Sequence, residues 1–199
     1  YTAWSSGGTA SKTYQITTTY TSAELYDLQF TQSADVMYIV HPDHPPAKLS
    51  RTAHTTWSLD DVAFTNGPYL DANTTATTLT PASAGTGTGV NITASAVTGI
   101  NNNVGWLASD VGREISFNSG KATITARTNS TVAVATITTA FTNTNATVAF
   151  QLDAWSATTG YPRTVSFFEQ RLVFGGSESY PQTIWASESG LYEEFDVGD

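Results

Sequence analysis

All three histidines of this chain, His41, His44 and His54, lie within the segment VHPDHPPAKLSRTAH (40–54), and Asp43 separates the first two. Imidazole nitrogens and a carboxylate at this spacing could bind a metal ion or transfer protons. The motif offers no third ligand at a suitable spacing, because His54 lies a predicted strand away. The chemistry of this segment therefore depends on what the rest of the sequence predicts.

An internal repeat of the sequence indicates whether the turn that contains His41 and His44 requires histidines. MYIVHPDHPPAKLSRTAHTTWSLDDVA (37–63) aligns with LVFGGSESYPQTIWASESGLYEEFDVG (172–198) at an offset of 135 residues, with matching apolar positions and Pro46 opposite Pro181. Both copies predict a strand, a turn ending in proline, a second strand, a turn and a third strand. The second copy has no histidine in its turn, so the turn does not require one. We interpret the histidines as structural or idle and assign no metal site; an adventitious metal site and catalysis are the alternatives.

The carboxylates form two clusters, at Asp60–Asp61 and at Glu193–Glu194 with Asp196. A glycosidase needs two carboxylates on either side of a groove, so a hydrolase is one interpretation. The clusters occupy equivalent places in the two copies, where acidic residues at a solvated strand edge would protect against aggregation. We therefore assign no catalytic residue and predict that the protein is not an enzyme.

Five tryptophans could form a sugar-binding platform. Trp155 and Trp185 lie within apolar strand patterns and are predicted to be buried, together with Ile184 on the opposite face of its strand. Trp4, Trp57 and Trp106 remain open to ligand contact.

Composition predicts an all-β protein and restricts its partners. β-Branched and aromatic residues suit strands, and Glu-, Lys- and Leu-rich helical stretches are nearly absent. The net charge of −9 argues against the phosphate contacts of nucleic-acid binding and against anionic membranes. The chain has no cysteine, which excludes disulfides and cysteine-based zinc sites. No cofactor is predicted.

The chain divides into three segments that differ in composition and in the pattern of predicted strands. Residues 1–67 contain predicted strands at 35–41, 47–52 and 57–64 and a stretch at 22–30 that could start a short helix. Residues 68–155 are rich in Thr, Asn, Ala and Gly, with three strands in 110–137 and another in 146–155. Residues 156–199 resemble the first segment in their pattern, with short strands predicted at 163–170, 171–176, 182–189 and 192–198. We predict propeller-blade-like antiparallel β-units flanking an inserted small β-barrel, whose ends leave and re-enter at neighbouring points.

The predicted core of the insert consists of apolar residues from its strands: Ile115, Phe117, Ile124, Val132, Val134 and Ile137.

Two stretches, 27–64 with QSADVMYIVHPDHPPAKLSR and 161–195 with FFEQRLVFGGSESYPQTIWAS, resemble the blade sequences of bacteriophage and prophage tail proteins. The resemblance is to the nozzle (tubular tail protein B-like) group of short-tailed phages. The segment between them, with ASDVGREISFNSGKATITARTNSTVAVATI, is similar to a small β-barrel inserted in such proteins. It also resembles the FCCH-like barrel of ubiquitin-activating enzymes in architecture only.

The resemblance implies a structural tail component in a longer protein, with further blades outside these residues. The implied assembly is a hexameric ring through which DNA passes, in contact with adaptor and fibre proteins and with no membrane partner. The implied location is the virion tail, with the host cytoplasm before assembly. A carbohydrate-binding or adhesin module is the alternative function, and a propeller-type hydrolase is a third.

Overall fold

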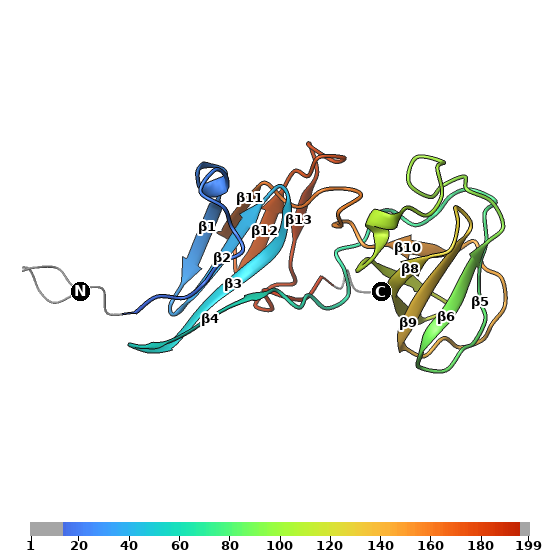
Figure 1. Ribbon diagram of the computed structural model, residues 1–199, viewed down its shortest axis with the longest axis horizontal. Helices are drawn as coiled ribbons and strands as arrows, with labels where there is room; N and C mark the ends of the chain where they lie inside the picture. The colour runs from blue at the N-terminus through green and yellow to red at the C-terminus, as the bar shows by residue number, and fades with distance from the viewer. Residues whose placement is uncertain (1–13, 196–199) are drawn as a thin grey trace, which may run out of the picture.

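The computed structural model describes residues 14–195, and within them the chain is all-β, with three antiparallel sheets (Figure 1). This confirms the predicted fold class. Two of the sheets pack together at one end of the molecule, and the third forms a separate body at the other end. The prediction of a strand at 192–198 fails for the described residues 192–195, which form a turn followed by a single bridge between Glu194 and Thr65.

The first sheet is a four-stranded meander in the order β1-β2-β3-β4. A 3₁₀ turn, η1 (Glu24–Tyr26), precedes it, and its strands are β1 (Gln29–Ser33), β2 (Val36–His41), β3 (His44–Ala53) and β4 (Thr56–Asp61). Prolines 45 and 46 are part of β3, so the turn between β2 and β3 contains only Pro42 and Asp43. The predicted turn ending at Pro46 is therefore wrong, because the chain pairs His41 with His44 directly.

The second sheet of this end contains β11 (Thr164–Phe168), β12 (Arg171–Gly175) and β13 (Ile184–Ala186). This sheet and the first sheet share an aromatic-rich core. The buried residues of that core are Tyr38, Val40, Ala154, Trp155, Leu172, Phe174, Trp185 and Phe195. The ring of Trp155 lies edge-on to those of Phe174 and Trp185 at 4.9 and 5.5 Å. The core thus joins segments from both ends of the sequence, because neither sheet can bury its apolar face alone.

The offset of the repeat is wrong by one residue on its first strand. An offset of 135 pairs Met37 with Leu172, but the buried apolar residues of β2 are Tyr38 and Val40, and those of β12 are Leu172 and Phe174. Side chains alternate between the faces of a strand, so a shift of one residue matches opposite faces.

The expectation that Ile184 is covered also fails. Trp185 is buried as predicted, but Ile184 is 73% exposed among the described residues. Strand β13 lies at the edge of its sheet, where only one face meets the core.

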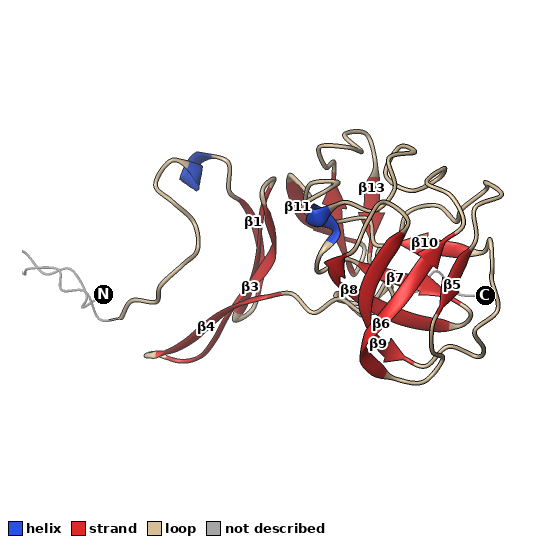
Figure 2. Cartoon of the chain, turned by 45° about the vertical axis from the view of Figure 1, so that its right-hand side comes forward, coloured by secondary structure: helices blue, strands red, loops and turns tan. Residues whose placement is uncertain are grey.

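The middle of the chain forms a six-stranded sheet that curls into a half-barrel (Figure 2). Its order is β10-β7-β8-β9-β6-β5, and a 3₁₀ turn, η2 (Ala108–Asp110), lies before β7. The strands are β5 (Leu79–Pro81), β6 (Gly87–Ala94), β7 (Glu114–Phe117), β8 (Gly120–Arg127), β9 (Val132–Thr139) and β10 (Phe150–Leu152). Two backbone hydrogen bonds between Leu79 and Thr147 bring the β5 edge to the segment that enters β10.

The half-barrel has its own core, in which Ile115, Phe117, Ile124 and Ile137 are buried as predicted. Val132 and Val134 are only half-buried, because β9 turns Ala133, Ala135 and Ile137 inward. The remaining core members include Leu79, Ile92, Ile100, Trp106, Phe141, Phe150 and Leu152.

The chain enters and leaves the half-barrel at adjacent points, as the sequence predicted. Leu70 N–H donates to Leu152 O, and Ala154 N–H donates to Pro68 O, both at 2.8 Å. Tyr69 Oη also donates to Glu114 Oε1 of β7. These contacts hold the entering and leaving segments of the chain against each other and hold the entering segment against β7.

Candidate functional site

The turn between β2 and β3 brings the two closely spaced histidines together. His41 and His44 pair across the sheet, and their ring centroids lie 5.1 Å apart. The ring of Tyr20 contacts both, edge-on to His44 at 5.2 Å and tilted to His41 at 6.3 Å. A tight turn with one histidine on each side places both rings at the same end of the sheet.

Glu24, the first residue of η1, completes this cluster. His44 Nε2 lies 3.0 Å from Glu24 Oε1, and the side chains of both residues are 25% exposed. The other carboxylate oxygen accepts the backbone N–H of Thr21 at 2.6 Å. The Thr21 N–H, and then the hydrogen bond with His44, lower the pKa of Glu24 to about 2. Glu24 is therefore held as a carboxylate facing the histidines.

His41 is the buried member of the cluster, with 2% of its surface exposed. Its Nδ1 accepts the backbone N–H of Asp43 at 3.1 Å, whereas its Nε2 has no hydrogen-bond partner among the described residues. A buried polar atom without a partner is uncommon and calls for a physical explanation.

Glu24, His41 and His44 together form a candidate metal centre. One ligand atom from each residue lies within 4.8 Å of the other two. The argument that the HPDH motif has no third ligand thus fails in the folded chain, because η1 supplies a carboxylate from 17 residues before the first histidine. No spacing rule could have selected Glu24, which is one of 17 acidic residues.

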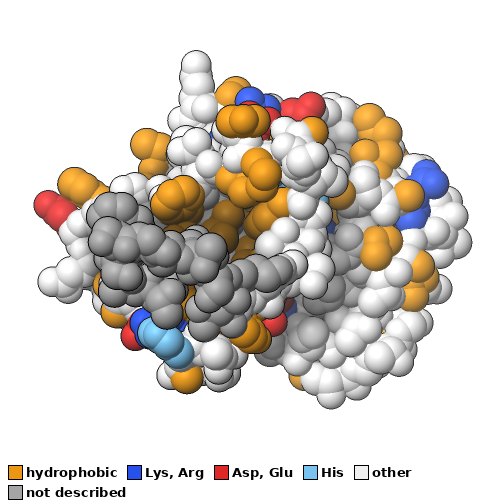
Figure 3. Space-filling view, turned by 60° about the vertical axis from the view of Figure 1, so that its left-hand side comes forward, with side chains coloured by type: hydrophobic (Ala, Val, Ile, Leu, Met, Phe, Trp, Pro, Cys, Tyr) orange, Lys and Arg blue, Asp and Glu red, His pale blue; other side chains and the backbone are white. Residues whose placement is uncertain are grey.

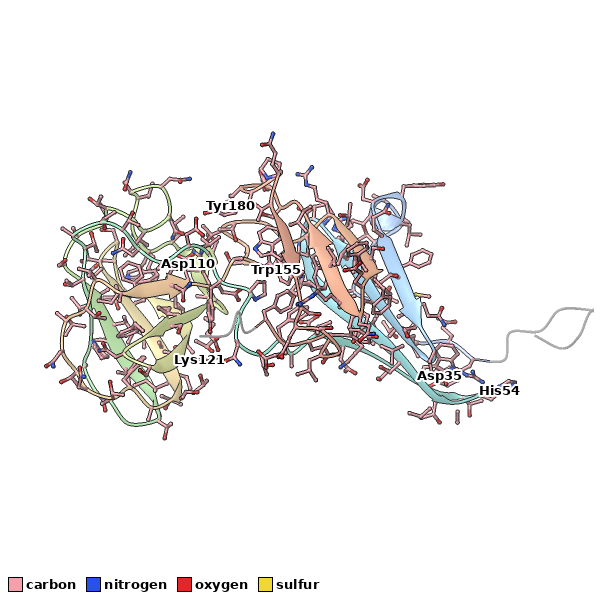
Figure 4. All side chains as sticks on the ribbon, turned by 180° about the vertical axis from the view of Figure 1, so that it is seen from behind. Asp35, His54, Asp110, Lys121, Trp155 and Tyr180 are labelled. Atoms are coloured by element: carbon pink, nitrogen blue, oxygen red, sulfur yellow. The ribbon has the colours of Figure 1, made fainter. Side chains whose placement is uncertain are left out.

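His54 lies elsewhere, as the sequence predicted. It is exposed at the tip of the β3–β4 hairpin, close to Asp35, far from the half-barrel (Figure 4). Its Nδ1 is 3.3 Å from Arg51 Nη2. It takes no part in the cluster.

A second candidate site is a hollow of about 150 Å³ on the face of the first sheet that points away from the shared core. It is lined by Met37, Leu49 and Trp57, with Gln32, Asp35 and Arg51 as its polar residues. Arg51 forms an ion pair with Asp35 at 3.1 Å and lies 5.8 Å from the centre of the Trp57 ring. Figure 3 shows hydrophobic side chains gathered on this side of the molecule.

The predicted tryptophans separate into two groups. Trp155 and Trp185 are buried, as expected, and Trp106 is also buried, in the half-barrel core. Trp57 is 37% exposed, so among the described tryptophans it alone offers surface to a ligand. Trp4 lies outside the described residues.

The carboxylate clusters connect parts of the fold. Glu193 accepts hydrogen bonds from Lys48 Nζ at 2.7 Å and from Tyr38 Oη at 2.8 Å, and this links the end of the chain to β2 and β3. Thr65 Oγ1 donates to Glu194 at 2.6 Å. Asp60 and Asp61 are exposed in β4, and Asp196 lies outside the described residues.

Comparison with models of known protein families and with curated proteins gives no match for this chain. No helix among residues 14–195 is long and apolar enough to cross a membrane.

Proposed function

We propose that this chain is a structural part of a phage or prophage tail. It would belong to the nozzle through which DNA passes and act by protein–protein assembly, with no catalysis. The support is the resemblance of its two flanking stretches to tail-nozzle blades, together with an all-β fold of small antiparallel sheets. Its partners would be other copies in a hexameric ring and the adaptor and fibre proteins, and its location would be the virion tail.

One observation carries this proposal furthest: the first sheet has apolar residues on both faces. Tyr38 and Val40 fill the shared core. Met37, Leu49 and Leu59 pair across three strands on the opposite face, where each is only half-buried. A sheet with two apolar faces is expected where other sheets cover it on both sides, as between the blades of a propeller.

The charge of the chain also fits a conduit. The net charge is −9, and an acidic wall does not bind the phosphates of a passing duplex. DNA would thus be a passenger and not a ligand.

The direct test is to look for the full-length protein in purified particles of the phage that encodes it, by mass spectrometry and by electron microscopy of a labelled copy. We expect a ring at the tail. Leu49→Asp on the uncovered face should reduce incorporation, whereas Thr93→Asp, on an exposed position of β6, should not. Particles without the protein, or normal incorporation of the Leu49→Asp variant, would contradict the proposal.

The hollow beside Trp57 supports a second candidate, a carbohydrate-binding or adhesin module. An exposed aromatic ring beside charged and amide side chains suits the apolar face and the hydroxyl groups of a sugar. A glycan array probed with the chain should then give signals that are lost in Trp57→Ala. If no glycan is retained, or if Trp57→Ala binds equally well, this alternative is wrong.

A further inference from the structure

The geometry points to a transition-metal site at Glu24, His41 and His44, which would bind a zinc-type divalent ion and clip η1 to the tip of the β2–β3 hairpin. This inference is independent of the proposed tail function. It rests on three residue types that bind such ions, gathered from two separate parts of the chain.

The distances are close to what coordination requires. Bonds of 2.0–2.1 Å in a tetrahedral site would place ligand atoms ~3.3 Å apart. The Glu24 oxygen and the His44 Nε2 are already 3.0 Å apart, and no pair of ligand atoms exceeds 4.8 Å. Glu24 and His44 are partly exposed, so small side-chain rotations can close the remaining gap.

The unpartnered nitrogen of His41 is the second, independent observation. In the neutral ring, acceptance of the Asp43 N–H at Nδ1 places the proton on Nε2, which is buried without an acceptor. Binding a metal through Nε2 moves this proton to Nδ1, and binding through Nδ1 uses its lone pair. Either way the Asp43 N–H loses its acceptor. Because Asp43 is exposed, water can replace that hydrogen bond.

The ligand set selects the class of ion. Two imidazoles and one carboxylate suit zinc and its transition-metal neighbours, whereas Mg²⁺ and Ca²⁺ prefer oxygen ligands alone. Three protein ligands leave at least one position for water. The partial exposure of Glu24 and His44 provides the path by which the ion and that water enter.

The two parts that the ion would join differ in how firmly they are held. Within the described residues, η1 has no buried residue, so it contributes nothing to either core. The tip of the β2–β3 hairpin is fixed to the segment that precedes β11, because Tyr161 N–H donates to Pro42 O at 3.0 Å. A metal would therefore fasten a loosely packed segment to an anchored one, as structural zinc sites do.

The test is calorimetric titration of the untagged chain of 199 residues with Zn²⁺ near neutral pH, with Mg²⁺ as the control ion. We expect one Zn²⁺ per chain and no Mg²⁺ binding. Glu24→Gln and His44→Ala should each weaken Zn²⁺ binding at least ~10-fold, since even outer partners of a metal site contribute that much. His54→Ala is the matched control and should bind as the wild type does.

A second measurement does not depend on any variant. Long-range proton–nitrogen spectra of the imidazoles should show Zn²⁺ shifting His41 and His44 but not His54, and the Asp43 amide should shift as it loses its acceptor. Absence of Zn²⁺ binding, or binding that Glu24→Gln leaves unchanged, would reduce the cluster to a histidine–carboxylate ion pair. Binding abolished by His54→Ala would place the ion at the tip of the β3–β4 hairpin instead of at the proposed site.

Discussion

A buried ion pair in the half-barrel provides the sharpest test of its packing. Arg113 and Asp110 have fully buried side chains, and Arg113 Nη1 lies 3.2 Å from Asp110 Oδ1. Arg113 also donates to Asn101 Oδ1 at 2.7 Å and to the backbone oxygen of Asp153 at 2.9 Å. One guanidinium thus serves three acceptors where the chain leaves the half-barrel; Figure 4 marks Asp110 there.

Replacing Arg113 with Met keeps an unbranched apolar chain as far as the position of Nε, but it removes the rest of the guanidinium and leaves Asp110 charged and buried. Loss of one partner of a buried pair costs about 3–5 kcal/mol of unfolding free energy. Asp110 still accepts from Leu107 N–H at 2.8 Å and from Thr158 Oγ1 at 2.8 Å, and these bonds stabilise its charge. We therefore expect a loss near the lower end, ~3 kcal/mol.

Urea unfolding followed by tryptophan fluorescence measures this loss, because Trp106 is buried in the half-barrel core. Arg163→Met is the control: Arg163 is exposed, and this change should stay within ~0.5 kcal/mol of wild type. Adding Asp110→Asn to Arg113→Met should recover part of the stability by removing the unpaired charge. A loss below ~1 kcal/mol in Arg113→Met, or no recovery in the double variant, would refute the reasoning.

Three further predictions follow from burial. Leu172→Ala, in the shared core, should cost about 2–5 kcal/mol, whereas Ile184→Ala should be nearly neutral; equal losses in urea unfolding would mean that β13 is placed wrongly. Burial raises the pKa of Asp153 to about 7 from 3.8, so the folded chain holds this proton more tightly and stability should fall as pH rises from about 4 to 7. The fall should reach at most ~4 kcal/mol relative to Asp153→Asn, and a constant difference between the two proteins across that range would contradict it. Residues 68–155 expressed alone should give a dispersed proton–nitrogen spectrum, since they contain the whole half-barrel core; a collapsed spectrum would show that the core depends on the flanking sheets.

Much of the strand pattern could be read from local chemistry. The strands β7, β8 and β9 were predicted because alternating residues meet turn residues at Asn118–Ser119 and Asn129–Ser130. Strands β5 and β6 were not predicted, because their Thr- and Gly-rich sequence has the composition of a loop. Pairing with β9 makes β6 a strand, and that partner begins at Val132, 45 residues after Gly87, the first residue of β6.

Which face of a strand is buried could not be read from the same residues. Val132 and Val134 are more apolar than Ala133 and Ala135, yet the alanines face the core, where Ala133 pairs with Ile92 of β6 and Ala135 with Ile124 of β8. Likewise, Ile184 is apolar but exposed at a sheet edge. Local hydrophobicity predicts that a strand has an inner face, but the choice of face depends on the residues, distant in the sequence, that the strand packs against.

The sequence by itself determined that the chain is all-β, that Trp155 and Trp185 are core residues, and that the middle segment differs in composition from the segments on either side of it. These follow from composition, alternation and turn residues, which act over a few neighbours. The tertiary structure alone decided the candidate metal centre. Glu24 reaches His41 and His44 only because η1 packs beside the turn that pairs the histidines, and no short-range pattern records a contact between segments so far apart.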